Sequence, residues 1–407
     1  SGSACMDCMN PTCSIRGSPL DSQPPVWIAL AVEGKWKQAC DALHEHNNFP
    51  EFTSLICPAP CQSACKRSHM GYPVAVQRVE ASIIDRAFEE GYVAPKPAAR
   101  KTGRSVAVVG SGPAGLAAAQ QLARAGHDVT VFEKEALPGG LLRYGIPAFR
   151  LDKSLIDRRL EQLKAEGVEF KTNHVIGRDT PAEDLLCRFD AVLLATGATK
   201  GRDLNVPGRD KQGVIFALDY LRRCNEQTQN SIDVRDKIVA VIGGGLTGED
   251  CVETSLLRGA REVHQFEIMP RPKTQPHAAV DHGEALTRRW CVATRGFGGE
   301  DHIQELHAVQ VQWQGAGKMS ELPQSDFRMK IDLAVLAMGF DSVVDADIAR
   351  GLGLEVDSRG GIVARDFATS VPGVFVAGDI AEGASFVATA INSGRQAAAR
   401  IIKHLEA

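Results

Sequence analysis

Two glycine-rich loops, Gly110–Gly115 and Gly243–Gly248, each stand between an apolar β-branched run and a helical pattern. A second apolar run follows each helix, so a strand–helix–strand unit occurs twice. Seven of the eleven cysteines lie in the first 65 residues, which show no strand alternation. These observations predict an α/β protein with two Rossmann-like nucleotide-binding domains, one inserted in the other, preceded by an α-helical, cysteine-rich domain.

The composition is typical of a soluble globular protein and excludes two kinds of partner. Charged residues make up 24% and apolar residues 44% of the 407 residues. The net charge of -4 argues against nucleic-acid binding, and no apolar run is long enough to span a membrane. The first four residues lack the basic and apolar segments of a signal peptide. We therefore expect a cytoplasmic protein whose clustered thiols stay reduced.

The cysteine-rich domain is expected over residues 1–100, as loops with two helices. The helical patterns cover Pro25–His46 and Val74–Glu90, and Gly91 stops the second helix. The polar, proline-bearing segment Pro95–Lys101 is then a linker.

The first nucleotide-binding unit has strands at Ser105–Gly110 and Val129–Glu133, with a helix at Pro113–Arg124 between them. A buried strand, Ala191–Thr196, ends at Gly197. Together these elements predict the first part of the outer domain.

The second unit repeats this order with strands at Lys237–Gly243 and Glu262–Glu267 and a helix between them that ends near Arg258. Another buried strand covers Ile331–Met338, and the chain ends with a strand at Val374–Val376 and a helix. The predicted boundaries are 101–235 and 340–407 for the two pieces of the outer domain and 236–339 for the inserted one.

The glycines of the first loop suit a dinucleotide. Gly110 permits a tight turn, Gly112 lets the backbone approach a pyrophosphate, and Gly115 lets the helix pack close to the sheet. The helix that starts at Pro113 and Ala114 directs its N-terminal N–H groups and dipole at the phosphates. A glycine-rich turn without a ligand is the alternative.

FAD is the predicted ligand of the first loop. Glu133, about twenty residues after the loop, can hold a ribose diol. The last strand ends at Gly378 and Asp379, and the Asp379 carboxylate can accept hydrogen bonds from ribityl hydroxyls, which NAD lacks.

The second loop is expected to bind NADPH through Gly243, Gly245 and Gly248, with Leu246 and Thr247 beginning its helix. Glu267 favours an unphosphorylated ribose, whereas Arg271 and Lys273, close behind it, favour a 2′-phosphate. One charge-assisted bond to that phosphate contributes roughly 1.5–3 kcal/mol. The alternatives are NADH and, for the cations, an ordinary solvated surface.

The early cysteines form two groups with metal-ligand spacing: Cys5, Cys8 and Cys13, then Cys57, Cys61 and Cys65. Zinc and iron–sulfur clusters both use thiolates at such spacings. Zinc sites usually close with paired Cys-x-x-Cys knuckles, which the second group lacks, and this favours clusters.

Several long stretches resemble the small (beta) subunit of bacterial glutamate synthase and, more broadly, the N-terminal half of dihydropyrimidine dehydrogenase. These stretches are Cys5–Cys8, Asn47–Thr53, Cys57–Cys65, Ile83–Phe88, Gly139–Pro147 and Phe266–Pro270. The resemblance covers nearly the whole chain and implies two [4Fe–4S] clusters, FAD and NADPH. Further candidate cofactor contacts are Gly140, Leu141, Arg143 and Gly197.

The same resemblance implies the ligands of each cluster. One cluster is expected on Cys5, Cys8, Cys13 and Cys65, and the other on Cys57, Cys61 and Glu80. A solvent-facing helix position is the alternative for Glu80. Ser18 stands where the family has a cysteine, so we expect one or two clusters. The other cysteines are expected to be small buried residues: Cys40, Cys187, Cys224, Cys251 and Cys291.

These features predict an oxidoreductase that passes electrons from NADPH through FAD and clusters to a partner protein in a hetero-oligomer. The partner is a glutamate synthase large subunit, a ferredoxin or another oxidoreductase subunit. A disulfide reductase is disfavoured because Cys251 and Cys291 stand alone, without a Cys-x-x-Cys motif. A scaffold subunit without turnover has only Ser18 and Leu246 in its favour, since the family usually has Asp or Asn in place of Leu246.

Overall fold

The computed structural model describes residues 5, 8, 11–226, 232–271, 283–315 and 317–406. Contacts divide the chain into two compact units. The first unit contains residues 1–143, 148–198 and 342–407, and the second contains residues 144–147 and 199–341. No helix in the described ranges is long and apolar enough to cross a membrane.

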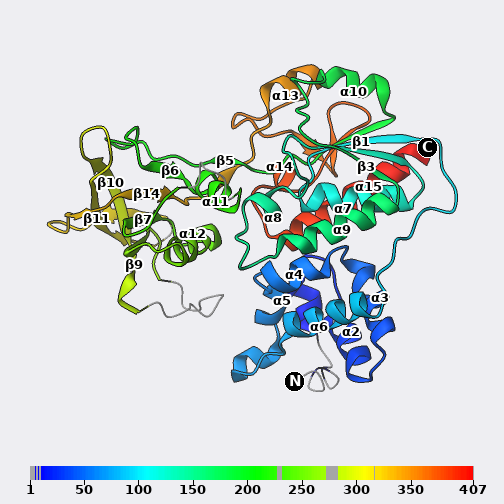
Figure 1. Cartoon of the computed structure of the whole chain (residues 1–407), viewed down its shortest axis with the longest axis horizontal. Coiled ribbons are helices and arrows are strands. Elements are labelled where there is room, and N and C mark those ends of the chain that lie inside the picture. The colour runs from blue at the N-terminus through cyan, green and yellow to red at the C-terminus, as the bar shows by residue number, and fades with distance from the viewer. Residues whose placement is uncertain are drawn as a thin grey trace. The chain divides into compact units, whose positions relative to one another are not determined.

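The first unit begins with a helical part around a core that includes Trp27, Leu43 and Ile83 (Figure 1). Its elements are η1 (Cys13–Gly17), α2 (Pro24–Val32), α3 (Trp36–His46), α4 (Pro50–Ile56), α5 (Pro60–Ser63), η2 (Lys66–Met70) and α6 (Val76–Glu89). The predicted single helix over Pro25–His46 is wrong, because Gly34, with a φ of +76°, stands between α2 and α3.

A seven-stranded sheet follows, in the order β16-β17-β18-β4-β1-β2-β3. Its elements are β1 (Ser105–Val109), α7 (Pro113–Arg124), β2 (Asp128–Phe132), α8 (Leu141–Tyr144), α9 (Lys153–Ala165), β3 (Val168–Lys171), α10 (Ala182–Arg188), β4 (Ala191–Leu194), α13 (Ala346–Leu352), β16 (Ala364–Arg365), β17 (Ala368–Thr369), β18 (Val374–Val376), α14 (Asp379–Glu382) and α15 (Val387–Glu406).

Strands β18, β4, β1, β2 and β3 are parallel, so their carboxyl ends share one edge of the sheet. The first glycine loop, Glu133, Gly197 and Gly378 follow four of these strands and are brought to that edge. Open α/β sheets bind their ligands at this edge.

Helices α7, α9 and α15 lie between the sheet and the helical part, as Figure 1 shows. On the opposite face, Leu185 of α10 and Ile348 of α13 join a core with Val192 and Val374 of the sheet. The first unit is therefore layered, with the helical part packed against α7, α9 and α15.

The second unit contains a five-stranded parallel sheet, β6-β14-β7-β8-β9, and an antiparallel sheet, β10-β11-β12 with β13 on β11. Its elements are β5 (Lys200–Gly201), β6 (Val214–Phe216), α11 (Ala217–Glu226), β7 (Ile238–Ile242), α12 (Leu246–Leu257), β8 (Glu262–Glu267), η3 (Gly283–Ala285), β9 (Leu286–Trp290), β10 (Val292–Gly298), β11 (Glu305–Trp313), β12 (Met319–Glu321), β13 (Phe327–Lys330), β14 (Leu333–Leu336) and β15 (Phe340–Asp341).

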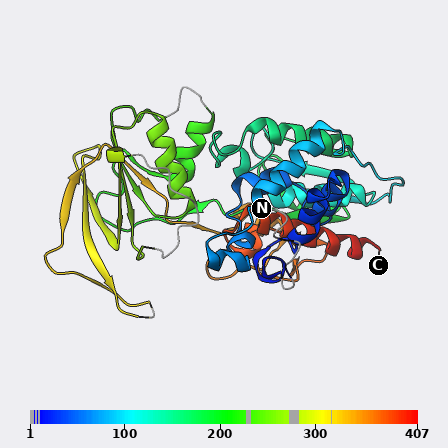
Figure 2. The same cartoon turned by 90° about the horizontal axis from the view of Figure 1, so that it is seen from below.

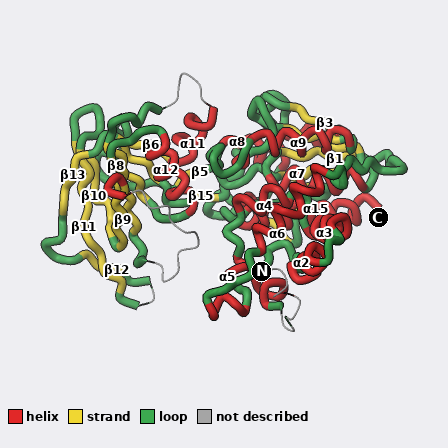
Figure 3. The backbone as a smooth tube through the Cα atoms, turned by 60° about the horizontal axis from the view of Figure 1, so that its bottom comes forward, coloured by secondary structure: helices red, strands yellow, loops and turns green. Residues whose placement is uncertain are grey.

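Helices α11 and α12 cover one face of the parallel sheet, and the antiparallel strands pack on the other (Figures 2 and 3). Strand β6 pairs with β14, which brings the segment from residue 199 into this unit. The packing therefore changes at residue 199 and not at the predicted boundary, 236.

Candidate functional site

The first glycine loop joins β1 to α7. Its glycines are of two kinds, those that pack against the backbone and one that faces open space. A Cβ on Gly110 would lie 2.4 Å from the Ala195 carbonyl oxygen, and one on Gly115 would lie 2.1 Å from that of Gly110. Gly112 has φ and ψ of -68° and -178°, which suit any residue, and nothing lies within 4 Å of its Cβ position. The outer glycines are required by the protein's own backbone, whereas Gly112 faces open space at the start of α7. Such a space fits a pyrophosphate.

Glu133 is buried beside this loop and holds it. Its Oε2 accepts hydrogen bonds from the Ser111 N–H, at 3.0 Å, and from the Ser111 hydroxyl. Its Oε1 accepts from the Glu135 N–H at 2.9 Å. The carboxylate is thus fixed at the mouth of the loop before any ligand binds.

The Gly139–Pro147 stretch packs onto the loop through Gly140. Gly140 has a φ of +51°, and a Cβ there would lie 2.9 Å from the Gly112 Cα atom. Leu141 begins α8. The buried Arg143 donates from Nη2 to Asp157 at 2.5 Å and from Nε to the Pro138 carbonyl oxygen at 2.7 Å. Arg143 therefore supports the stretch from within.

Gly378 and α15 complete the edge of the sheet. Gly378 has a φ of +72°, and a Cβ there would lie 2.7 Å from the Ala114 Cβ atom. Its N–H donates to the Ser393 hydroxyl at 2.8 Å. A Cβ on Gly394 would lie 2.1 Å from the Ala114 carbonyl oxygen. Sequence reasoning predicted Gly378 and Ala114 but missed Ser393 and Gly394, although a glycine inside a helix is a signal of close packing.

Asp379 starts α14, directly after Gly378. Burial raises the pKa of its carboxyl, Glu382 adds to that rise, and a hydrogen bond from Ser385 at 2.7 Å opposes it. Gly197, after β4, has a φ of +75° and open space at its Cβ position. Both positions lie at the carboxyl edge of the sheet and remain candidates for ligand contact.

The second glycine loop has the same construction. A Cβ on Gly243 would lie 2.1 Å from the Ala337 carbonyl oxygen, and one on Gly248 would lie 2.3 Å from that of Gly243. Gly245 has φ and ψ of -78° and 179°, with nothing within 4 Å of its Cβ position. Leu246 and Thr247 form the first turn of α12. This loop therefore fits a second pyrophosphate.

Glu267 occupies the place that Glu133 has in the first unit. The Gly244 N–H donates to its Oε2 at 2.5 Å, and the Met269 N–H donates to its Oε1 at 2.8 Å. Each carboxylate thus binds the second residue of its loop and the residue two positions after itself.

The two predicted cations, Arg271 and Lys273, follow β8 in the sequence. Arg271 is exposed, and its guanidinium lies 5.0 Å from the centre of the Trp290 ring. Lys273 lies outside the described residues.

A residue that sequence reasoning missed, Arg288, supports the second loop. It donates to Glu249 at 2.5 Å and to Gln265 at 2.9 Å, and Gln265 donates to the Gly243 carbonyl oxygen at 3.1 Å. Only its position on a strand beside β8, which is a long-range feature, could have indicated this role.

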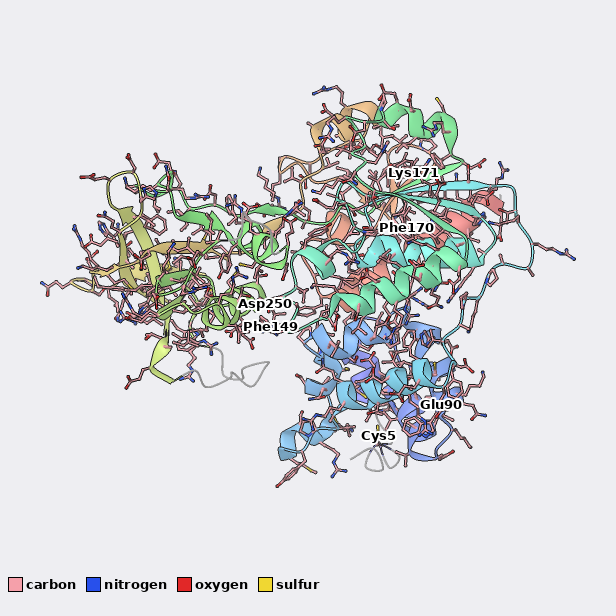
Figure 4. The ribbon with its side chains drawn as sticks, in the orientation of Figure 1. Cys5, Glu90, Phe149, Phe170, Lys171 and Asp250 are labelled. Atoms are coloured by element: carbon pink, nitrogen blue, oxygen red, sulfur yellow. The ribbon has the colours of Figure 1, made fainter. Side chains whose placement is uncertain are left out.

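The first cysteine group and Cys65 lie together in the helical part. Figure 4 labels Cys5 there. Burial raises the pKa of Cys5 to about 11, and the nearby thiols of Cys13, Cys8 and Cys65 add to the rise. Thr12 donates to the Ala64 carbonyl oxygen at 2.6 Å, which ties the two cysteine-bearing segments together. Four thiols from two segments of the chain are thus neighbours.

Cys57, Cys61 and Glu80 form the second neighbourhood. Burial raises the pKa of Cys57 to about 11 and that of Cys61 to about 12, and in both cases Glu80 contributes. Glu80 is buried, so it is not the solvent-facing residue of the alternative interpretation. Burial raises the pKa of Glu80 to about 7. Two hydrogen bonds to its Oε1, from Thr53 at 2.7 Å and from Asn47 at 3.2 Å, oppose this rise.

In both neighbourhoods the described side chains are near one another without the geometry of a metal site. Among the described residues, no three His, Cys, Asp or Glu side chains are already arranged to hold a metal ion. Thiols must lose their protons to become ligands, so cluster assembly has to displace the protons that burial retains. The chemistry of the donors, all described cysteines being free thiols, fits iron–sulfur ligation.

The Ser18 hydroxyl accepts hydrogen bonds from the N–H groups of Leu20 and Ser22, each at 3.3 Å, and so caps a turn. Of the five cysteines outside the groups, Cys40, Cys224 and Cys251 are buried as expected. The expectation is wrong for the exposed Cys187, and Cys291 is half-buried.

Comparison with known proteins gives the family. Residues 104–394 match the pyridine nucleotide-disulphide oxidoreductase family, and residues 1–92 match dihydropyrimidine dehydrogenase domain II, 4Fe-4S cluster. The NADPH glutamate synthase small chain of Mycobacterium tuberculosis is 46% identical over 98% of this chain and 87% of that one. The NADH glutamate synthase of Schizosaccharomyces pombe is 39% identical over 98% of this chain and 20% of its own length.

A solved structure confirms the predicted fold. FprA from Mycobacterium tuberculosis, in complex with NADPH, covers 74% of this chain and 85% of its own, with a TM-score of 0.63 and 20% identity. The resemblance read from the sequence is likewise confirmed. The chain belongs to the glutamate synthase small-chain family, and it is an oxidoreductase that binds FAD and a pyridine nucleotide and carries a 4Fe–4S domain.

Proposed function

We propose that this chain takes electrons from NADPH and delivers them to a glutamate synthase large chain. The observation that supports this proposal is the repeated loop construction, with Gly112 and Gly245 both facing open space. Two separate dinucleotide sites are what a donor nucleotide and FAD need. FAD accepts a hydride and returns its electrons singly, which suits a two-electron donor that feeds iron–sulfur clusters.

We assign FAD to the first loop, with Glu133 and Asp379, and NADPH to the second loop. Each carboxylate accepts the N–H group of the second residue of its loop and so holds the loop in shape beside the open space that Gly112 or Gly245 faces. One [4Fe–4S] cluster is proposed on Cys5, Cys8, Cys13 and Cys65. The other is proposed on Cys57, Cys61 and Glu80. The free thiols fit a reducing compartment such as the cytoplasm.

The isolated protein is expected to reduce artificial dyes with NADPH and to form no glutamate from glutamine and 2-oxoglutarate. Adding the large chain should give glutamate formation, measured as amino acid produced per NADPH oxidised. If dye reduction is normal but the mixture makes no glutamate, the proposed acceptor is wrong and a ferredoxin or another oxidoreductase subunit takes its place.

Nucleotide choice depends on the cations after β8. We expect the double change Arg271→Ala and Lys273→Ala to raise the KM for NADPH about tenfold or more and to leave the KM for NADH nearly unchanged. A charge-assisted contact to the 2′-phosphate has this magnitude. Steady-state kinetics with both nucleotides measures the ratio, and Arg261→Ala, an exposed cation before the same strand, is the control. An unaltered ratio would remove these residues from the site.

A further inference from the structure

Residues Asn47–Thr53, which we call the bridging segment, contact both Glu80, a proposed cluster ligand, and the helices of the flavin-type domain. On one side, Asn47 and Thr53 donate to Glu80 Oε1, at 3.2 and 2.7 Å. Asn47 also donates to Thr53 at 2.7 Å, so the three side chains form one buried network. Through Glu80, this side of the segment adjoins Cys57 and Cys61.

The next residue, Asn48, faces the helices of the flavin-type domain. Its amide donates to Gln120 of α7 at 2.7 Å, and its side-chain oxygen accepts from Arg395 of α15 at 2.6 Å. Arg395 also donates to the Glu45 carbonyl oxygen at 2.5 Å. Two adjacent residues of the chain thus have different partners: Asn47 binds Glu80, and Asn48 binds α7 and α15.

Three successive residues of α15 connect Asn48 to the first glycine loop. Ser393 accepts a hydrogen bond from Gly378, and Gly394 packs against Ala114 at the start of α7. Arg395 follows them and binds Asn48. The loop that faces the pyrophosphate and the segment that contacts Glu80 are therefore joined by one helical turn.

A second joint holds the bridging segment from α9. The Glu51 and Arg159 side chains are 2% and 1% exposed, and they form a two-point ion pair at 2.6 and 2.7 Å. The Arg159 guanidinium also lies 5.6 Å from the centre of the Phe49 ring. Buried two-point pairs of this kind fix orientation as well as distance.

We propose that the bridging segment sets the separation between the flavin site and the Cys57–Cys61–Glu80 site, with Arg395 and Arg159 as its positioning residues. The proposal rests on the cluster assigned to those ligands. Each hydride from NADPH brings two electrons, which pass singly to the clusters, and one proton is released to solvent. One-electron transfer slows exponentially with distance, so loosening this joint slows that step while hydride delivery at the second loop is preserved.

The test compares Arg395→Met with Arg400→Met. Arg400 lies on the same helix, is 42% exposed and pairs with Asp366, so Arg400→Met is the matched control. In Arg395→Met we expect NADPH to reduce the flavin within about twofold of the normal rate, and the clusters to be reduced at least about tenfold more slowly, in stopped-flow absorbance. Arg395→Lys, which keeps one of two contacts, should give an intermediate rate.

A second readout does not depend on the clusters. Hydrogen exchange of the backbone amides in α4 should accelerate in Arg395→Met and in Asn48→Ala but not in Arg400→Met. Protein without iron would refute the proposed clusters, yet the exchange result would still test the joint. Unchanged cluster reduction together with unchanged exchange would overturn the inference. An equal slowing of flavin reduction and cluster reduction in Arg395→Met and in Asn48→Ala would overturn it as well.

Discussion

Replacing Gly112 by valine is expected to abolish FAD retention while the chain still folds. The backbone angles at Gly112 suit a β-branched residue, and its Cβ position meets nothing within 4 Å. The added Cβ atom therefore clashes with no part of the protein, and the side chain extends into the space that the pyrophosphate needs. Loss of that approach is expected to weaken FAD binding far more than tenfold, which corresponds to well over 1.4 kcal/mol. Flavin absorbance per protein measures it.

Gly245→Val is the matched variant, because its backbone and surroundings repeat those of Gly112. It should keep the flavin and prevent its bleaching by NADPH. Circular dichroism should show both variants folded. Equal flavin loss from both would refute the assignment of two nucleotides to two loops.

Gly17→Val should empty the cluster sites and leave the flavin bound. A Cβ on Gly17 would lie 2.7 Å from the Cys61 Cα atom and 3.1 Å from the Pro60 carbonyl oxygen. Backbone cannot yield as a flexible side chain does, so η1 must separate from α5. The two cysteine-bearing segments would then part, and iron should fall from about four to eight atoms per chain to nearly none.

Iron and acid-labile sulfide per flavin measure this effect in protein prepared without oxygen. Ser63→Val, which adds the same side chain at an exposed position of α5, should retain its iron. Iron contents that match in the two variants would show that the segments need not be in contact. Zinc in place of iron would contradict the cluster assignment itself.

Much of the fold could be predicted where a local pattern determines it. The helix Pro113–Arg124 and the strand Glu262–Glu267 begin and end as expected, because glycines and apolar runs mark their limits. The break at Gly34 was missed, since an apolar pattern continues across it. The placement of β6 depends on its pairing with β14, which no local pattern reports.

The candidate site shows the same division. Loop glycines and cysteine spacings are readable because their chemistry requires a fixed local order. The contacts that join the domains cannot be predicted from the sequence in this way. Arg159 and Glu51 are 108 residues apart in the chain, and Arg395 and Asn48 are 347 apart. Each is an ordinary charged or polar residue in sequence, and only the folded chain gives it a partner.

The Arg159–Glu51 pair also bears on how this protein can evolve. A buried ion pair that loses one partner destabilises what remains by about 3–5 kcal/mol, because the other charge stays without compensation. Arg159 belongs to the nucleotide-binding module and Glu51 to the cysteine-bearing one. The two residues can therefore change without this cost only together, so a substitution at Arg159 has to be matched by one at Glu51.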